Sequence, residues 1–297
     1  MFTIGKLFHL THVVSNLEAM DRWYDDVFSV NRFYRQYLEE AVRDASLACI
    51  GDCVMESVQL AYHIPGAERS PIGKFYARFG QRFHSIAWYV DSVKDLCAAL
   101  HRHNLHLYDI TGKLVTEPEG IDAVWTHPKQ THGLLEFITI GSFEVQDVRL
   151  QPNWSAAFWR DQHPLGIEQT SHVTVLIRDL QAAKTLYLDI LGGQLIHAEE
   201  IAGQKKSLFF AVGEDTIIET AQPLSATSPE GRELQQAGEG LYAVTFKTKN
   251  ITHAADFLQA KKQRIEWQGS ETFVLNREDA FGLVVGFTQR QLPNDPC

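Results

Sequence analysis

Two histidine and glutamate pairs recur in this chain at one fixed spacing. His9 and Glu56 lie 47 residues apart, and so do His172 and Glu219. Each histidine opens a segment typical of a strand, and each glutamate lies within another such segment. Imidazole nitrogens and carboxylate oxygens bind divalent metal ions, and a metal site assembled from separate strands needs a fixed spacing of this kind. The pattern therefore marks these four residues as candidate metal ligands.

The sequence around the two pairs repeats as well, which indicates an internal duplication. Residues 8–28 overlay residues 171–191, and residues 51–60 overlay residues 213–222. A chain of 297 residues also exceeds what one hydrophobic core usually serves. We therefore predict two similar domains, at residues 1–145 and 167–297, joined by a connector at 146–166. The connector is rich in Trp, Pro and charge, and we expect it to be ordered and packed on both domains, because Gly and Ser are too few for a flexible linker.

Each predicted domain divides again into two units of the same plan. A strand leads into a helix, and three short strands follow. Polar residues that favour the first position before a helix mark the four helix starts, at Asn16, Ser92, Asp179 and Asn250. Leu17, together with later apolar residues at helical spacing, gives the first helix one buried face. The chain therefore contains four units of strand, helix and three strands.

Composition excludes several classes of function. Hydrophobic residues make up 44% and charged residues 22%, which is ordinary for a globular chain. The net charge of −10, without a stripe of Lys and Arg, argues against a nucleic-acid partner. No stretch approaches the roughly 20 apolar residues of a membrane helix, and no secretory signal is evident at the start, so we expect a cytoplasmic protein without a membrane partner.

The four cysteines do not form a recognisable site. Cys49, Cys53, Cys97 and Cys297 show no C-x-x-C pairing and no histidine at zinc-finger spacing. We therefore expect reduced, mostly structural thiols.

The four repeated units resemble the vicinal oxygen chelate superfamily, which includes glyoxalase I, methylmalonyl-CoA epimerase, extradiol dioxygenases and bleomycin-sequestering proteins. The resemblance covers nearly the whole chain. It implies an α+β fold in which four βαβββ modules form two cup-shaped mixed-sheet domains, each cup surrounding a ligand. Such a fold does not by itself fix a function.

The resemblance implies a metal site in the first cup, because that family takes one ligand from the first and last strands of each paired unit. The corresponding residues are His9, Glu56, His84 and Glu136. Two imidazoles and two carboxylates suit an octahedral divalent ion such as Zn, Ni, Co, Mn, Mg or Fe(II). Ser85 aligns with the family position rather than His84. Since side chains alternate along a strand, His84 needs a β-bulge to reach the ion.

Two other residues compete for places in this site. His12 has the opposite strand parity from His9, so it is expected to face the helix layer or solvent. Gln59 could replace Glu56, since some epimerase-like sites use Gln on this strand. The internal repeat favours Glu56, because the overlay pairs it with Glu219.

The second cup retains only part of the implied set. His172 and Glu219 remain, whereas Tyr242 and Ala243 stand where the first half has His84 and Ser85, and Val285 matches Glu136. We therefore expect a degenerate domain that serves as a scaffold, covers the first cup or mediates a homodimer.

The resemblance implies three alternative functions. The first is a metal-dependent isomerase, lyase or epimerase that binds a small substrate through two adjacent oxygens, stabilises an enolate and uses Glu136 as the base. The second is an Fe(II) extradiol dioxygenase acting on a catechol, with His9, His84 and Glu136 as ligands and Glu56 pointing away. The third is a module that sequesters a small molecule without turnover.

Overall fold

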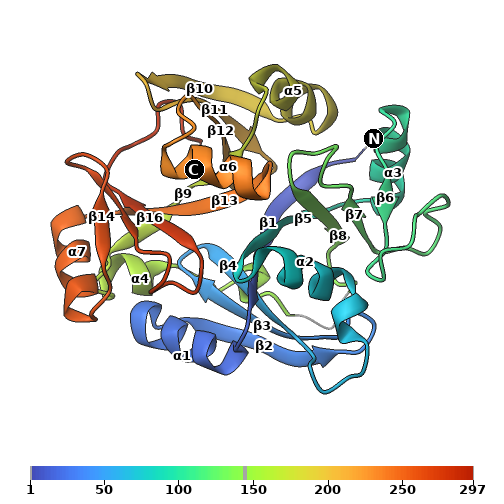
Figure 1. Ribbon diagram of the computed structural model, residues 1–297, viewed down its shortest axis with the longest axis horizontal. Coiled ribbons are helices and arrows are strands. Elements are labelled where there is room, and N and C mark those ends of the chain that lie inside the picture. Colours follow the sequence, from blue (N-terminus) through green and yellow to red (C-terminus); the bar gives the residue numbers. More distant parts are fainter. Residues whose placement is uncertain (1, 143–145, 297) are drawn as a thin grey trace.

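The computed structural model describes residues 2–142 and 146–296, and its elements repeat one order four times (Figure 1). The first half contains β1 (Ile4–Val14), α1 (Leu17–Phe28), β2 (Asn31–Leu38), β3 (Arg43–Ile50) and β4 (Cys53–Leu60), then β5 (Arg82–Val90), α3 (Val93–Arg102), β6 (Leu107–Tyr108), β7 (Ala123–Thr126) and β8 (Leu134–Thr139). The second half contains β9 (Ile167–Leu176), α5 (Leu180–Lys184) continued by the π-helix η3 (Thr185–Ile190), β10 (Gln194–Ile201), β11 (Lys205–Val212) and β12 (Thr216–Pro223), then β13 (Gly240–Thr248), α7 (Ile251–Ala260), β14 (Ile265–Trp267), β15 (Thr272–Leu275) and β16 (Val284–Thr288). Outside the repeats lie η1 (Ala67–Arg69), α2 (Pro71–Phe79), η2 (Val148–Leu150), α4 (Ala157–Asp161) and α6 (Pro229–Ala237).

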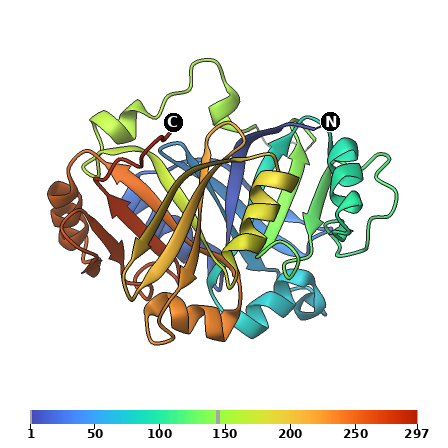
Figure 2. The ribbon, with the colours of Figure 1, turned by 90° about the horizontal axis from the view of Figure 1, so that it is seen from above.

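Each half forms one mixed sheet of eight strands. The strand orders are β2-β3-β4-β1-β5-β8-β7-β6 and β10-β11-β12-β9-β13-β16-β15-β14. The first strands of the two units pair antiparallel at the centre, and each runs parallel to the last strand of its own unit. Helices α1, α3, α5 and α7 lie at the periphery, while the two sheets stand side by side (Figures 1 and 2). The predicted α+β fold of four βαβββ modules is confirmed.

The four helix starts predicted from the sequence are also confirmed. Side-chain oxygens of Asn16, Ser92, Asp179 and Asn250 accept hydrogen bonds from backbone N–H groups in the first turns that follow. These bonds satisfy donors that otherwise have no partner within the helix. The caps therefore fix where each helix begins after its strand.

Two further helices were missed by the sequence analysis. The segment after β4 contains α2, and the equivalent segment after β12 contains α6; neither helix belongs to the predicted unit of strand, helix and three strands. Each begins with a serine whose hydroxyl accepts a backbone N–H, Ser70 or Ser228, followed by a proline at the first helical position. Proline suits that position because the N–H it lacks would have no helical partner there.

Two equivalent hydrogen bonds join the two halves. Asp52, in the turn between β3 and β4, accepts the backbone N–H of Thr170 in β9 at 2.8 Å. Asp215, in the equivalent turn of the second half, accepts the backbone N–H of Leu7 in β1, also at 2.8 Å. Each hairpin turn therefore binds the opening strand of the other half, as expected of an internal duplication.

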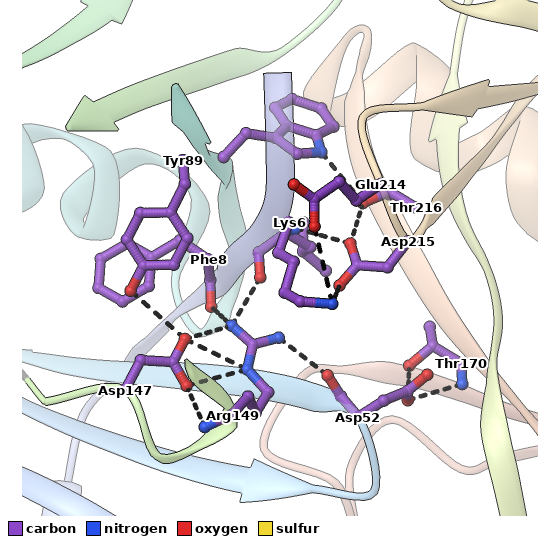
Figure 3. A network of polar contacts seen from close by, with 12 residues as sticks. Lys6, Phe8, Asp52, Tyr89, Asp147, Arg149, Thr170, Glu214, Asp215 and Thr216 are labelled. Carbon is purple, nitrogen blue, oxygen red and sulfur yellow. Dashed lines mark hydrogen bonds and ion pairs between the residues drawn. The ribbon is translucent and has the colours of Figure 1, made fainter. Parts of the chain in front are cut away.

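The connector packs against this junction through a buried ion pair (Figure 3). Arg149 and Asp147 lie 2.6 Å apart, Nη2 to Oδ2, with side chains 2% and 0% exposed. The Arg149 guanidinium also donates to the backbone carbonyls of Leu7, Phe8 and Asp52. One side chain of the connector thus joins β1 to the β3–β4 turn. The predicted domain boundary at residue 145 lies outside the described residues.

Cys49, Cys53 and Cys97 are buried free thiols, and Cys297 lies outside the described residues. Within residues 2–142 and 146–296, no helix combines the length and apolar character needed to cross a membrane.

Candidate metal centre

Strand register brings three of the four predicted ligands onto one face of the first sheet. His9 pairs with Ala87, which pairs in turn with Glu136. Glu56 pairs with Thr11, two residues beyond His9 in β1. Directly paired residues, and residues two apart along a strand, share a face. His9, Glu56 and Glu136 therefore point to the same side of the sheet from three different strands.

These three side chains meet in a dry environment. His9 Nε2 lies 3.4 Å from Glu56 Oε2 and 3.5 Å from Glu136 Oε2. All three side chains are at most 5% exposed. Neither ring nitrogen of His9 has a well-formed hydrogen-bond partner. A buried imidazole without such partners is costly, so this position is shaped for something other than apolar packing.

The electrostatics of the cluster are set by opposite charges at close range. Burial alone would lower the pKa of His9, but the carboxylates of Glu56 and Glu136 raise it above its ordinary value. Burial would likewise raise the pKa of Glu56, but the Arg43 guanidinium and His9 hold it below its usual range. The charged forms are therefore favoured at this position despite the loss of water.

Arg43 was missed by the sequence analysis. Its Nη2 donates to Glu56 Oε1 at 3.0 Å, while Thr11 Oγ1 donates to Glu56 Oε2 at 2.8 Å. The second half repeats this arrangement around Glu219, with Lys205 as the cation. Arg43 precedes its glutamate by 13 residues and Lys205 by 14, and this one-residue difference hides the correspondence in an ungapped overlay.

His84 occupies the bulge that the sequence analysis required. Thr11 pairs with Ser85 and the next residue of β1 pairs with Phe83, so His84 is the extra residue in β5. Its ring makes an edge-on contact with Phe75 of α2, at 4.6 Å between centroids. Burial lowers the pKa of His84 to about 3, and Arg43 adds to the effect. Its imidazole is therefore neutral at pH 7, the form that binds a metal ion, whereas His9 would release a proton on binding one.

Glu136 is held by the indole of Trp125 in β7. Trp125 pairs with Glu136 in the β7–β8 ladder, and its Nε1 donates to Glu136 Oε2 at 2.9 Å. This bond fixes one carboxylate oxygen.

A divalent ion requires several donor atoms arranged around one point. Among residues 2–142 and 146–296, no group of three or more His, Cys, Asp or Glu side chains is arranged so that it could hold an ion. Ligand atoms about 2.1 Å from one ion lie about 3.0 Å apart when adjacent in an octahedron and about 3.4 Å apart in a tetrahedron. The separations of 3.4 and 3.5 Å from His9 Nε2 to Glu56 and Glu136 are of this size, so each carboxylate is spaced from His9 as two ligands of one ion would be.

The competing residues have other partners. His12 is fully buried, and its Nε2 lies 2.9 Å from the carbonyl oxygen of Phe281. It is therefore not exposed to solvent, because β1 is covered there by the second half through Phe281, which also packs against Trp23 of α1. Gln59 Oε1 accepts the backbone N–H of Leu17 at 2.6 Å and so supports the start of α1.

Comparison with known proteins places the chain in a family. The model of the Glyoxalase/Bleomycin resistance protein/Dioxygenase superfamily matches residues 169–285. Mitochondrial methylmalonyl-CoA epimerase of Mus musculus is 30% identical over 128 residues, which span 40% of this chain and 71% of that protein. The chain belongs to this superfamily. The Homo sapiens epimerase matches to the same extent, at 30% identity over 72% of its length.

The fold of this superfamily member is also found in a solved structure of full length. A variant of 4-hydroxymandelate synthase from Streptomyces coelicolor superposes with a TM-score of 0.66 at 11% identity, covering 98% of this chain and 95% of that one. The likeness concerns the arrangement of both sheets.

The superfamily model matches the second half, which has fewer of the side chains that could bind a metal ion. His172 Nε2 lies 3.6 Å from Glu219 Oε2, and Tyr242 is the bulge residue of β13. The match of Val285 to Glu136 was wrong by one residue, because Thr245 pairs with both His172 and Gly286. Gly286 carries no side chain that could bind an ion.

Proposed function

We propose that this chain is a divalent-metal-dependent enzyme that transfers a proton on a small substrate, as an isomerase, epimerase or lyase. The proposed ligands are His9, Glu56, His84 and Glu136. The observation that carries the proposal is the convergence of two carboxylates on a buried imidazole without well-formed hydrogen bonds. Glu56 points towards His9 rather than away from it, which favours a four-ligand set over a three-ligand one.

An ion held by these residues would act as a Lewis acid for two adjacent substrate oxygens. Glu136 is the proposed base, because Trp125 binds its Oε2 and leaves Oε1 to accept the substrate proton. Thr11 and Arg43 fix both oxygens of Glu56 and so position that ligand. The dry surroundings strengthen each of these interactions.

The sequence relatives support proton transfer. The two similar mammalian proteins are methylmalonyl-CoA epimerases, and epimerisation is a proton transfer at carbon.

One observation favours a second candidate, an Fe(II) dioxygenase acting on a catechol. Glu56 already accepts bonds from Arg43 and Thr11. If those bonds persist, His9, His84 and Glu136 remain as two imidazoles and one carboxylate, the set that suits Fe(II) and leaves positions for substrate and oxygen.

Metal binding tests the site itself. Purified protein, stripped of metal and titrated with Mn²⁺ and Zn²⁺ by calorimetry, should bind one ion per chain. His9→Ala should abolish binding, whereas His172→Ala, the matched change in the second sheet, should leave it intact. The proposal would be contradicted if both variants kept their metal affinity or if both lost it equally. A native chain that binds no ion would instead favour a sequestering module.

Substrate chemistry separates the two enzyme candidates. We expect solvent deuterium to enter 2-oxo, 2-hydroxy or thioester substrates without oxygen consumption. Glu136→Gln should stop this exchange while keeping more metal affinity than His9→Ala. Oxygen uptake by the Fe(II)-loaded protein with catechols would overturn the proton-transfer proposal in favour of the dioxygenase.

A further inference from the structure

A second polar cavity lies outside the candidate metal centre, where the two halves meet. It has a volume of about 300 Å³ and is lined by Arg78, Phe79, Arg82, Glu233, Gln236 and Arg277, among others. We call it the seam groove. It lies where the C-terminal ends of α2 and α6 face each other (Figure 1). It therefore exists only when both halves are assembled.

The seam groove carries more positive than negative charge. Glu233 lies between two guanidinium groups, with Oε1 2.6 Å from Arg82 Nη2 and Oε2 2.6 Å from Arg277 Nη1. Arg78 adds a third cation to the lining. Three guanidinium charges against one carboxylate leave a local charge of +2, although the whole chain carries −10.

The charge excess is partly buried, which makes it costly without a counter-ion. The side chains of Arg82 and Glu233 are 13% and 9% exposed. Burial and the proximity of Arg277 both lower the pKa of Arg82, so the two guanidinium groups repel each other. One carboxylate cannot neutralise both.

The groove also orients its cations. The Arg78 and Arg82 guanidinium carbons lie 4.8 and 5.5 Å from the centroid of the Phe79 ring. A guanidinium has five N–H donors in a rigid plane, and Glu233 binds only one terminal nitrogen of Arg82 and one of Arg277. Donors therefore remain for a ligand with several oxygens.

We propose that the seam groove binds a small molecule carrying a dianionic phosphate group. A phosphate brings up to two negative charges and three acceptor oxygens, which match the local charge of +2 and the three guanidinium groups. The volume is at the lower end of small-molecule sites. The site is distinct from the metal centre and does not depend on the proposed function.

Calorimetric titration of the full chain tests this proposal. The probes are inorganic phosphate, glycerol 3-phosphate and malonate, with ionic strength held constant by sodium chloride. Arg78→Gln is the main variant, because Arg78 is exposed and its loss leaves the buried Arg82 and Glu233 pair intact. Arg277→Gln is the second variant. Arg22→Gln, at an exposed arginine paired only with Glu18, is the control of equal charge change.

We expect saturable binding of phosphate at one site, weakened about tenfold by Arg78→Gln and by Arg277→Gln, since one charge-assisted hydrogen bond contributes about that factor. Arg22→Gln should bind as the native chain does. If glycerol 3-phosphate saturates the site, the ligand class is a phosphorylated metabolite. If only inorganic phosphate saturates it, the ligand is the free ion, and either result supports the site. Heat that does not saturate, equal weakening in Arg22→Gln, or tighter binding of malonate would overturn it.

Discussion

Arg149 is expected to determine the stability of the whole chain, although it lies in the connector. The change Arg149→Met keeps most of the side-chain volume but removes the cation from Asp147, whose side chain is fully buried. It also removes the donor that Leu7, Phe8 and Asp52 share (Figure 3). Removing one partner of a buried ion pair costs about 3–5 kcal/mol. We therefore expect the free energy of unfolding to fall by about 4 kcal/mol.

Equilibrium unfolding in urea, followed by tryptophan fluorescence, measures this loss. Arg160→Met is the matched control on the same connector, because the side chain of Arg160 is 51% exposed and the ion pair that it forms is screened by solvent. The double variant Asp147→Asn with Arg149→Met removes the orphaned charge and should recover part of the stability. If Arg149→Met unfolds within about 1 kcal/mol of the native chain with an unchanged slope, the connector does not stabilise β1 and the β3–β4 turn as argued.

Three further outcomes are expected. Gly282→Ala places a Cβ 2.1 Å from a backbone oxygen of the other half, whereas the Cβ of Gly80→Ala, also at positive φ, meets nothing within 4 Å. The midpoint of urea unfolding should therefore fall far more for Gly282→Ala, and equal falls would mean that only the backbone angle matters. Burial lowers the pKa of His12 to about 4, below its unfolded value near 6.5. The contribution of neutral His12 to the free energy of unfolding should therefore be fully present above pH 6.5 and fall by about 3 kcal/mol as the pH decreases towards 4. His12→Leu should remove this part of the pH dependence, and an unchanged profile would refute the assignment. Trp125→Phe should lower kcat about tenfold at unchanged metal affinity, because Glu136 loses one fixed oxygen; an unaltered kcat would remove that role.

The sequence predicts the parts of this molecule that depend on local patterns. The constant spacing of His9 with Glu56 and of His172 with Glu219 reveals the duplication, and polar residues such as Asn16 mark the helix starts. The need for a bulge at His84 follows from strand parity alone. Whether His84 binds a metal stays a prediction.

What the sequence does not predict depends on register shifts and on contacts between the halves. The one-residue difference between the Arg43 and Lys205 spacings conceals the cation beside each glutamate. A similar shift made Val285 look equivalent to Glu136, where the ladder places Gly286. The burial of His12 against Phe281 depends on how two sheets meet, which no periodicity within either sheet encodes.

The reciprocal turns at Asp52 and Asp215 have a consequence for how such a molecule can evolve. Each turn binds the opening strand of the other half, and apolar contacts such as that of Phe28 with Phe287 add to the junction. The absence of a donor side chain at Gly286 removes none of these contacts. Substitutions on the concave surface of the second half should therefore be tolerated more readily than substitutions of Asp52 or Asp215.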